Sequence, residues 1–403
     1  MIKTKQVIRI FSSPRSLPHI FYAFTGFHSL LIGLFLFYVP VYLWERGADL
    51  AGISAFIAMV GFSFCGSLWL WDRLRRRLAF KDIIAASFFI EIAALSTIFL
   101  RESIFFLPCL AVILGAYNCF FWIIQRVLFV STISADNSGK KFGNFQIYVA
   151  IIFKIAIFTG GFILEKYGFI SLYFLSVFFS VWGVLYFYIQ PMQHSVAEEM
   201  SQTGPLSLAF LWNFRDRQRS KIIFALDGFF LYLESYFWII SLFFLTPKSF
   251  LRLGLLVIIL AIVLSIIFFI IKNRIDRADK QKVYLLAVAL YMAGWYMRGL
   301  VRKNMDDYIL YSLIICITFF TSFFRLAFNK RFFDHAKHRN SFKYILLKSY
   351  YSQFYLGIIF AGLALCYLFP PNFLKVTQIL SYTYFASSGL ALLYLLYPAS
   401  KAK

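Results

Sequence analysis

Four charged side chains lie inside stretches of this chain that are otherwise almost entirely apolar: Arg126, Asp227, Glu234 and Arg325. A guanidinium group binds carboxylate or phosphate through paired hydrogen bonds and stays protonated in an apolar cavity, so Arg126 and Arg325 are candidates for binding an anionic ligand. Asp227 and Glu234 lie two turns apart on one helical face, where each could bind a proton in competition with an arginine. The alternative interpretation is that the arginines pair internally with these acids or extend toward the membrane surface.

Further polar and aromatic side chains share helical faces with these charges or lie next to them. Trp122 and Trp238 could stack on a bulky ligand. His28 is a third candidate for proton coupling because histidine titrates near neutral pH, although a lone histidine is more often a packing or hydrogen-bonding residue. The complete set of predicted substrate-binding residues is Asn118, Trp122, Gln125, Arg126, Trp238, Ser322, Arg325, Lys348 and Tyr351.

The elements that must position these side chains are membrane-spanning helices. The chain has 403 residues, of which 61% are hydrophobic and 14% charged, and a soluble domain has about a quarter charged residues. Apolar runs of about 20 residues, enough to cross a bilayer, recur along the whole chain without the period of two expected of a barrel strand. The sequence therefore predicts an all-α polytopic membrane protein with about twelve spans, at approximately 20–43, 51–70, 82–100, 104–130, 142–164, 168–190, 221–245, 249–271, 282–300, 307–330, 342–368 and 374–397.

A charged loop is repeated about half a chain later. The segment WDRLRRR at 71–77 recurs in weaker form as IDRADKQK at 275–282, each time after the second apolar segment of its half. The repeat predicts two related six-helix bundles, 1–190 and 221–403, joined by a linker at 191–220. Asp72 could pair with a basic neighbour or lie at a helix N-terminus across the bundle interface, and so act in a conformational switch. A charge cluster that only fixes topology is the alternative. The predicted switch residues are Asp72, Arg73, Arg76, Arg77, Asp276 and Arg277.

The distribution of basic residues predicts the orientation. They concentrate in the N-terminal stretch and in the even-numbered loops, so the positive-inside rule predicts that both termini face the cytoplasm and that the protein lies in the cytoplasmic (inner) membrane. The formal net charge of +22 then reflects topology and contact with anionic lipid headgroups. Nucleic-acid binding is not predicted, because no soluble basic face exists.

The loop at 71–77 resembles the Gly-x-x-x-Asp-Arg-x-Gly-Arg-Arg motif of the major facilitator superfamily. The matching residues are Asp72, Arg73, Arg76 and Arg77, whereas Leu68 and Arg75 occupy the two glycine positions. The resemblance implies two pseudo-symmetric six-helix bundles that rock about a site near the middle of the membrane, giving alternating access. The proline-containing glycine motif of the antiporter branch is absent.

The sequence favours a secondary active transporter of a small organic anion or zwitterion, with proton coupling, that works as a monomer. An amphiphile or lipid translocator is the alternative transporter, and a non-transporting sensor or assembly factor is the alternative of another class. Phosphate-binding glycine loops, paired metal-ligand histidines and nucleophile motifs are absent from the sequence, so no enzyme activity, metal or cofactor is predicted. The predicted partners are the small-molecule substrate, membrane lipids and protons.

Overall fold

Backbone groups that cross a hydrocarbon layer have no water to bond, so they must be satisfied within helices. The computed structural model describes residues 17–100, 102–132, 138–189, 204–277, 279–337, 341–368 and 375–398, and all the regular elements within these ranges are helical. In chain order they are α2 (Leu17–Leu34), η1 (Leu36–Tyr38), α3 (Val39–Glu45), α4 (Leu50–Leu74), α5 (Phe80–Ser96), η2 (Thr97–Leu100), α6 (Phe106–Thr132), α7 (Ser138–Ile189), α9 (Leu208–Asn213), α10 (Ser220–Tyr232), η4 (Leu233–Trp238), α11 (Ile239–Leu245), α12 (Phe250–Arg277), α13 (Lys280–Leu300), α14 (Asp307–Lys337), α15 (Ser341–Leu368), α16 (Val376–Ala391) and η5 (Leu392–Leu396).

The predicted number of membrane-spanning helices is confirmed. Ten helical stretches within the described ranges are at least 18 residues long and apolar enough to cross a bilayer. Helix α5 falls just below that length with 17 residues. Helix α7 contains two spans, because Gly168 has a φ of 76° that breaks the helix between them; glycine reaches this conformation without steric cost. Counting α5 and dividing α7 accounts for the predicted number of about twelve.

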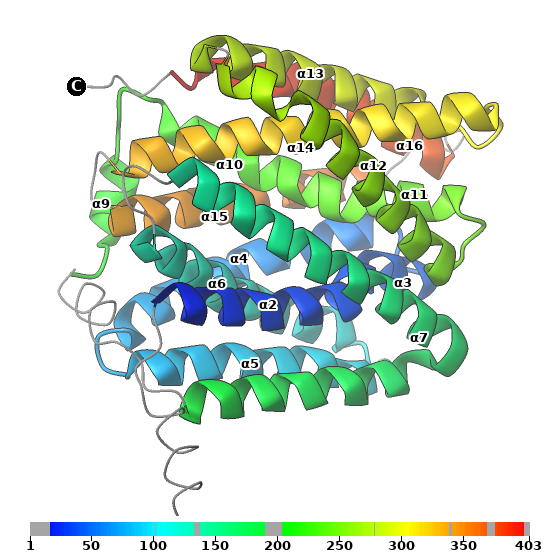
Figure 1. Ribbon diagram of the computed structural model, residues 1–403. Coiled ribbons are helices and arrows are strands. Elements are labelled where there is room, and N and C mark those ends of the chain that lie inside the picture. The colour runs from blue at the N-terminus through cyan, green and yellow to red at the C-terminus, as the bar shows by residue number, and fades with distance from the viewer. Residues whose placement is uncertain are drawn as a thin grey trace, which may run out of the picture.

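The helices of the two chain halves lie on opposite sides of the molecule (Figure 1). Helices α2 to α6 and the last part of α7 form the lower half of the view, and α10 to α16 form most of the upper half, with α15 and the first part of α7 between them. We refer to these groups as the N-terminal bundle (α2 to α7) and the C-terminal bundle (α10 to η5). The linker end is the end where Arg75 and Leu206 lie, and the far end is the end where Gly168 lies.

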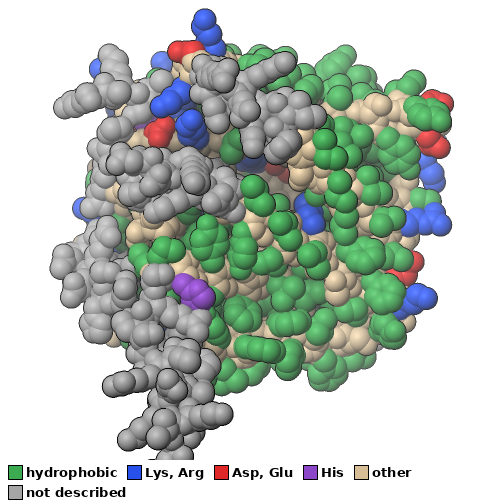
Figure 2. All heavy atoms as spheres, in the orientation of Figure 1, with side chains coloured by type: hydrophobic (Ala, Val, Ile, Leu, Met, Phe, Trp, Pro, Cys, Tyr) green, Lys and Arg blue, Asp and Glu red, His purple; other side chains and the backbone are tan. Residues whose placement is uncertain are grey.

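The outer surface matches a lipid environment. Hydrophobic side chains cover most of the middle of the face shown in Figure 2, and charged side chains lie mainly toward its two ends. On α7 the exposed side chains Phe174, Phe178, Trp182 and Leu185 follow one another at helical spacing. An apolar stripe of this kind would be unfavourable in water and is expected where a helix faces lipid.

Glycines allow α4 of the N-terminal bundle to contact α15 of the C-terminal bundle closely. A Cβ atom on Gly61 would lie 2.7 Å from the carbonyl oxygen of Gln353 and 3.0 Å from the nitrogen of Gly357. Small residues permit this backbone approach in membranes, where packing and not the hydrophobic effect drives helix association.

At the far end, α7 of the N-terminal bundle contacts α12 of the C-terminal bundle. The carboxylate of Glu165 accepts hydrogen bonds from Ser249 Oγ at 2.6 Å and from the Leu251 N–H at 2.9 Å, the latter in the first turn of α12. Acceptance from a first-turn amide satisfies a backbone donor that has no partner inside the helix. The two bundles are therefore in contact near the middle of α4 and at the far end.

One span of the C-terminal bundle is interrupted by a π-helical segment. Helix α10 passes into η4 at Leu233, and the α-helical pattern returns at Ile239 in α11. A π-helical turn contains an extra residue compared with an α-helical turn, and such segments are frequent at functional sites. Glu234 is the second residue of η4, so this irregularity lies where the sequence predicts a charged site.

The contact between α4 and α15 gives a matched pair of substitutions. Gly61→Ala places a methyl group against α15 backbone, whereas Gly66→Ala on the same helix meets no atom within 4 Å. We expect Gly61→Ala to destabilise the folded protein by about 1–3 kcal/mol through overpacking, and thus to lower the melting temperature of the purified protein below that of Gly66→Ala. Equal melting temperatures for the two variants would show that α4 and α15 do not pack this closely.

Candidate functional site

A network of ion pairs connects four helices of the C-terminal bundle. Arg325 on α14 contacts Asp227 on α10 at 2.5 Å and Glu234 in η4 at 3.0 Å. Lys348 on α15 contacts the second oxygen of Asp227 at 3.0 Å, and the hydroxyl group of Tyr291 on α13 donates to Glu234 at 2.6 Å. We call these five residues the carboxylate network.

The local structure explains why both acids reach the same arginine. Asp227 and Glu234 are two helical turns apart, which places them on one face of the span. Arg325 lies between them, and Nη1 binds Asp227 while Nε and Nη2 bind Glu234. A planar guanidinium has five N–H donors in a fixed arrangement, so it can bind two carboxylates at once with defined geometry. The internal pairing considered from the sequence is thus present for Arg325.

Side chains of α6 in the N-terminal bundle face this network across the bundle interface. Arg126 donates to Ser349 Oγ on α15 at 3.0 Å, and its guanidinium carbon lies 5.6 Å from the ring centroid of Trp122. Asn118 donates to the Tyr232 hydroxyl on α10 at 3.2 Å. Within the part of the chain that the structure describes, Arg126 forms no ion pair with a carboxylate. Arg126 is therefore a cation beside the network without a direct anionic partner among the described residues.

Arg298 on α13 belongs to the same region, and the sequence did not identify it. Its side chain is 2% exposed, and its guanidinium lies 4.2 Å from the Trp295 ring and 5.2 Å from the Trp238 ring. Nη2 donates to Thr321 at 2.7 Å, but Nε and Nη1 have no hydrogen-bond partner within the described residues. Aromatic faces compensate part of the charge. Arg298 is thus a buried cation near the network with two nitrogens that lack a hydrogen-bond partner among the described residues.

The other predicted binding residues occupy varied positions. Gln125 is buried on α6 and Ser322 is half-buried on α14. Trp238 packs against Arg298 and, edge to face, against Tyr384. The Tyr351 hydroxyl donates to the Leu211 carbonyl of α9, so its polar group points toward the linker end and away from the carboxylate network.

His28 belongs to a separate cluster inside the N-terminal bundle. Its ring nitrogens lie 3.0 Å from the Tyr117 hydroxyl and 3.0 Å from Ser87 Oγ, and Nδ1 lies 3.5 Å from Glu91. These contacts come from α5 and α6. The three candidates for proton coupling are therefore divided between two sites, with Asp227 and Glu234 in one bundle and His28 in the other.

The repeated charged loop makes a buried contact at the linker end. Asp72 pairs with Arg75 at 2.7 Å and accepts from the Leu206 N–H at 2.8 Å. The Arg75 guanidinium lies 4.6 Å from the ring of Phe342 on α15, so the pair touches the other bundle. Burial lowers the pKa of Arg75 and the neighbouring Asp72 opposes that change, but a guanidinium stays protonated under such conditions.

Other predicted switch residues take no part in this contact. Arg73 is exposed and lies over the Trp69 ring at 3.5 Å, and Arg76 and Arg77 are exposed. Asp276 and Arg277 lie where side chains are outside the described residues. The arginine of the loop that makes the buried contact is thus Arg75, at a position where the motif has glycine.

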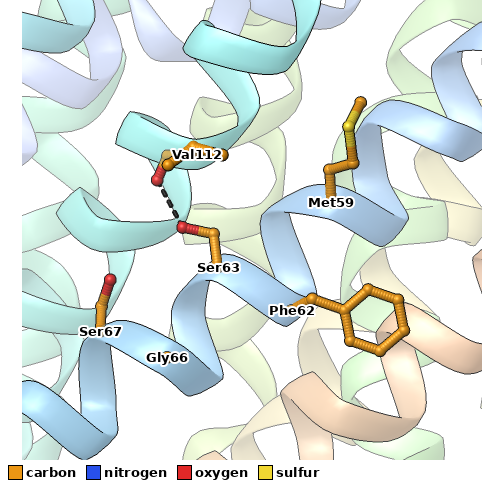
Figure 3. Close-up of a pocket in the computed structure, with 6 residues that line it drawn as sticks. All are labelled: Met59, Phe62, Ser63, Gly66, Ser67 and Val112. Carbon is orange, nitrogen blue, oxygen red and sulfur yellow. Dashed lines mark hydrogen bonds between the residues drawn. The ribbon is translucent and has the colours of Figure 1, made fainter.

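A cavity of about 430 Å³ lies away from these charges, on the outer face of α4 and α6. Its lining consists of Met59, Phe62, Ser63, Gly66, Ser67 and Val112. Figure 3 shows the Ser63 hydroxyl directed at the Val112 carbonyl, to which it donates at 2.5 Å. The lining contains no charged residue, so recognition of a charged ligand is better supported at the carboxylate network than here.

Comparison with known proteins connects the fold to transporters. No family model and no curated protein sequence matches the chain. Among solved structures, nucleoside transporter NupG matches with a TM-score of 0.64 and 16% identity over 96% of this chain and 100% of that chain, and a mutant of it with 0.66 and 15% over 95% and 100%. A D-xylose-proton symporter matches with 0.68 and 10% over 96% and 98%. These are transporters of the major facilitator superfamily, so the chain has that fold, as its sequence predicts.

Two tyrosines of α13 allow the carboxylate network to be tested. Tyr291→Phe removes the donor to Glu234, whereas Tyr296→Phe alters a side chain that is 53% exposed. We expect Tyr291→Phe to reduce stability by about 1–3 kcal/mol because a partly buried acceptor loses its partner, and Tyr296→Phe to have little effect. The measurement is the melting temperature of each purified variant; a Tyr291→Phe protein as stable as the control would contradict the network.

Proposed function

We propose that the protein is a secondary active transporter that moves a small organic anion or zwitterion across the cytoplasmic membrane by alternating access. The observation that carries the proposal is the imbalance of charge at the bundle interface. Three cations, Arg126, Arg325 and Lys348, meet two carboxylates, Asp227 and Glu234. Both termini would face the cytoplasm, and the protein would act as a monomer.

An anionic substrate group would correct this imbalance. A charge held in a low-dielectric interior is costly unless it is paired and hydrogen-bonded. Among the described residues Arg126 contacts a hydroxyl group and an aromatic ring but no carboxylate, so a substrate carboxylate or phosphate would supply the missing anion. The Trp122 ring beside Arg126 would pack on an apolar part of the substrate, and Gln125 and Ser322 would provide hydrogen bonds. A zwitterion would place its cationic group near Asp227 or Glu234.

The position of Arg126 suits a transport cycle. Its contact with Ser349, and that of Asn118 with Tyr232, join the two bundles across their interface. Rocking of one bundle against the other would break such contacts and open the site between them to the other side of the membrane. Substrate binding would thus be linked to the change of access.

Protons would act through the same acids. Protonation of Glu234 would weaken its pairing with Arg325, which would then be available to the substrate anion. Asp227 would keep its partner Lys348 during this step, because Lys348 contacts its second oxygen. Proton uptake and anion binding would therefore favour each other, as symport requires.

The lateral cavity supports the second candidate, an amphiphile or lipid translocator. Its lining combines apolar side chains with two serines, and it opens on the outer face of α4 where acyl chains would lie. Substrate screening distinguishes the two candidates. A melting temperature raised by carboxylates or phosphates, and not by lysolipids, favours the anion transporter, since a ligand of the folded state stabilises it by mass action; the converse result favours the translocator.

Transport of the stabilising compound into liposomes then tests the site. We expect Arg126→Ala to reduce flux at least about tenfold, since a charge-assisted hydrogen bond contributes about 1.5–3 kcal/mol. Arg126→Lys should recover part of the flux, because lysine keeps the positive charge but lacks the planar set of donors of a guanidinium. Arg252→Ala, which removes an exposed arginine of α12, is the control. Full flux in Arg126→Ala would exclude this site, and no flux in the wild-type protein with any compound would favour the non-transporting sensor.

The linker-end contact would hold the two bundles together at that end, as the switch residues of the motif are expected to do. We expect Arg75→Gln to increase the distance between spectroscopic labels at positions 77 and 217, because Asp72 loses its partner. Arg76→Gln, which changes an exposed neighbour, should leave the distance distribution unchanged. If Arg75→Gln and Arg76→Gln give the same distance distribution, the charged loop only determines the orientation of the protein in the membrane.

A further inference from the structure

The His28 cluster contains a carboxylate, Glu91, whose ion-pair partner among the described residues is the histidine itself. Glu91 is 1% exposed and His28 is fully buried. Oε2 of Glu91 has no hydrogen-bond partner within the described residues, although Nδ1 of His28 is only 3.5 Å away. A buried carboxylate oxygen without a donor is rare and costly.

The hydrogen bonds of the cluster determine where its protons lie. The Ser87 hydroxyl donates to the Ile84 carbonyl at 2.6 Å, so Ser87 Oγ can only accept from Nε2 of His28, 3.0 Å away. Nε2 therefore carries a proton, and in the neutral ring Nδ1 must be an acceptor. The Tyr117 hydroxyl, 3.0 Å from Nδ1, has one proton to give.

The cluster is therefore one proton short. Two acceptors, Nδ1 of His28 and Oε2 of Glu91, lie beside one donor, the Tyr117 hydroxyl. A proton bound to Oε2 of Glu91 would remove this deficit, since the carboxyl O–H would then donate to the single lone pair of Nδ1 and the Tyr117 hydroxyl would donate to the other Glu91 oxygen. The added proton would also change the net charge of Glu91 and His28 from minus one to zero, and a neutral pair is more stable than a charged one in an apolar interior.

We infer that Glu91 and His28 form a proton-binding site within the N-terminal bundle, in which the proton resides on Glu91 and is shared with Nδ1 of His28. When the proton leaves, Nδ1 loses that donor and the Tyr117 hydroxyl remains to stabilise the Glu91 carboxylate. The site joins α2, α5 and α6, so binding and release of the proton change the hydrogen bonds that connect these three helices.

The surroundings of the pair are aromatic. The His28 ring stacks on Phe88 with centroids 4.3 Å apart and also contacts Phe24 and Phe121, and Phe187 of α7 packs on Phe88 and Phe24. The titratable groups in contact with one another here are His28, Glu91 and Tyr117. The ion pairs of the C-terminal bundle involve different helices, so this proton site is distinct from the carboxylate network.

Infrared spectroscopy of the full-length protein in nanodiscs, without substrate, tests the inference. As pH is raised, the wild-type protein should lose one protonated-carboxyl stretching band that is absent at every pH in Glu91→Gln. Glu102→Gln, which changes a carboxyl group that is 80% exposed, should retain the band. A spectrum of Glu91→Gln that titrates like the wild type would overturn the proposal.

A second variant keeps the test decisive if Glu91→Gln does not fold. Tyr117→Phe removes the hydroxyl that stabilises the carboxylate, so the Glu91 band should persist to higher pH than in the wild type. Tyr173→Phe removes a hydroxyl of the same bundle that bonds Ser96 instead and should leave the titration unchanged. An unchanged titration in Tyr117→Phe would refute the site. Because no substrate is present, this result is independent of whether the protein transports an anion.

Discussion

Charge inside the membrane must be compensated, and this constraint organises the C-terminal bundle. Arg325 binds Asp227 and Glu234, and Lys348 and Tyr291 bind the oxygens that remain. Removing one partner of a buried ion pair typically costs about 3–5 kcal/mol, so α10, α13, α14 and α15 are held in one arrangement by these contacts. The cations outside this balance are Arg126 and Arg298, and they lie where a ligand or a change of conformation could alter their environment.

The fold was predictable because the bilayer imposes a simple rule on the chain. Apolar runs of span length, charged loops and the repeat of 71–77 at 275–282 were sufficient for the spans and the fold class, since hydrophobic length and loop charge are local properties. Even the separation of two spans near Gly168 was visible, as a short interval between predicted segments. Helical periodicity also identified the faces that carry Asp227, Glu234 and Arg325, because residues three, four or seven apart share a face.

Contacts between distant helices were less predictable. Arg298 lies near the predicted end of its span, where an arginine is usually explained by extension to the membrane surface, yet it turns inward against two tryptophans. Arg75 occupies a position where the family motif has glycine, so the motif gave no reason to select it. Tyr291 and Tyr117 are ordinary aromatic residues of apolar segments, and only the packing of separate helices gives their hydroxyl groups a carboxylate or histidine partner.

The π-helical segment η4 determines how far α11 is rotated about the helix axis relative to α10, within one span. An α-helix turns by about 100° per residue, so the extra residue of η4 sets the rotation of α11 relative to α10. Shortening the segment by one residue would turn α11 by that angle and swing Ser241 away from Tyr384, to which it is bonded at 2.8 Å. The length of η4 cannot change without separating the two halves of this helix from the partners each has now. An insertion or deletion here would thus displace every contact of α11 at once, whereas a substitution changes one side chain.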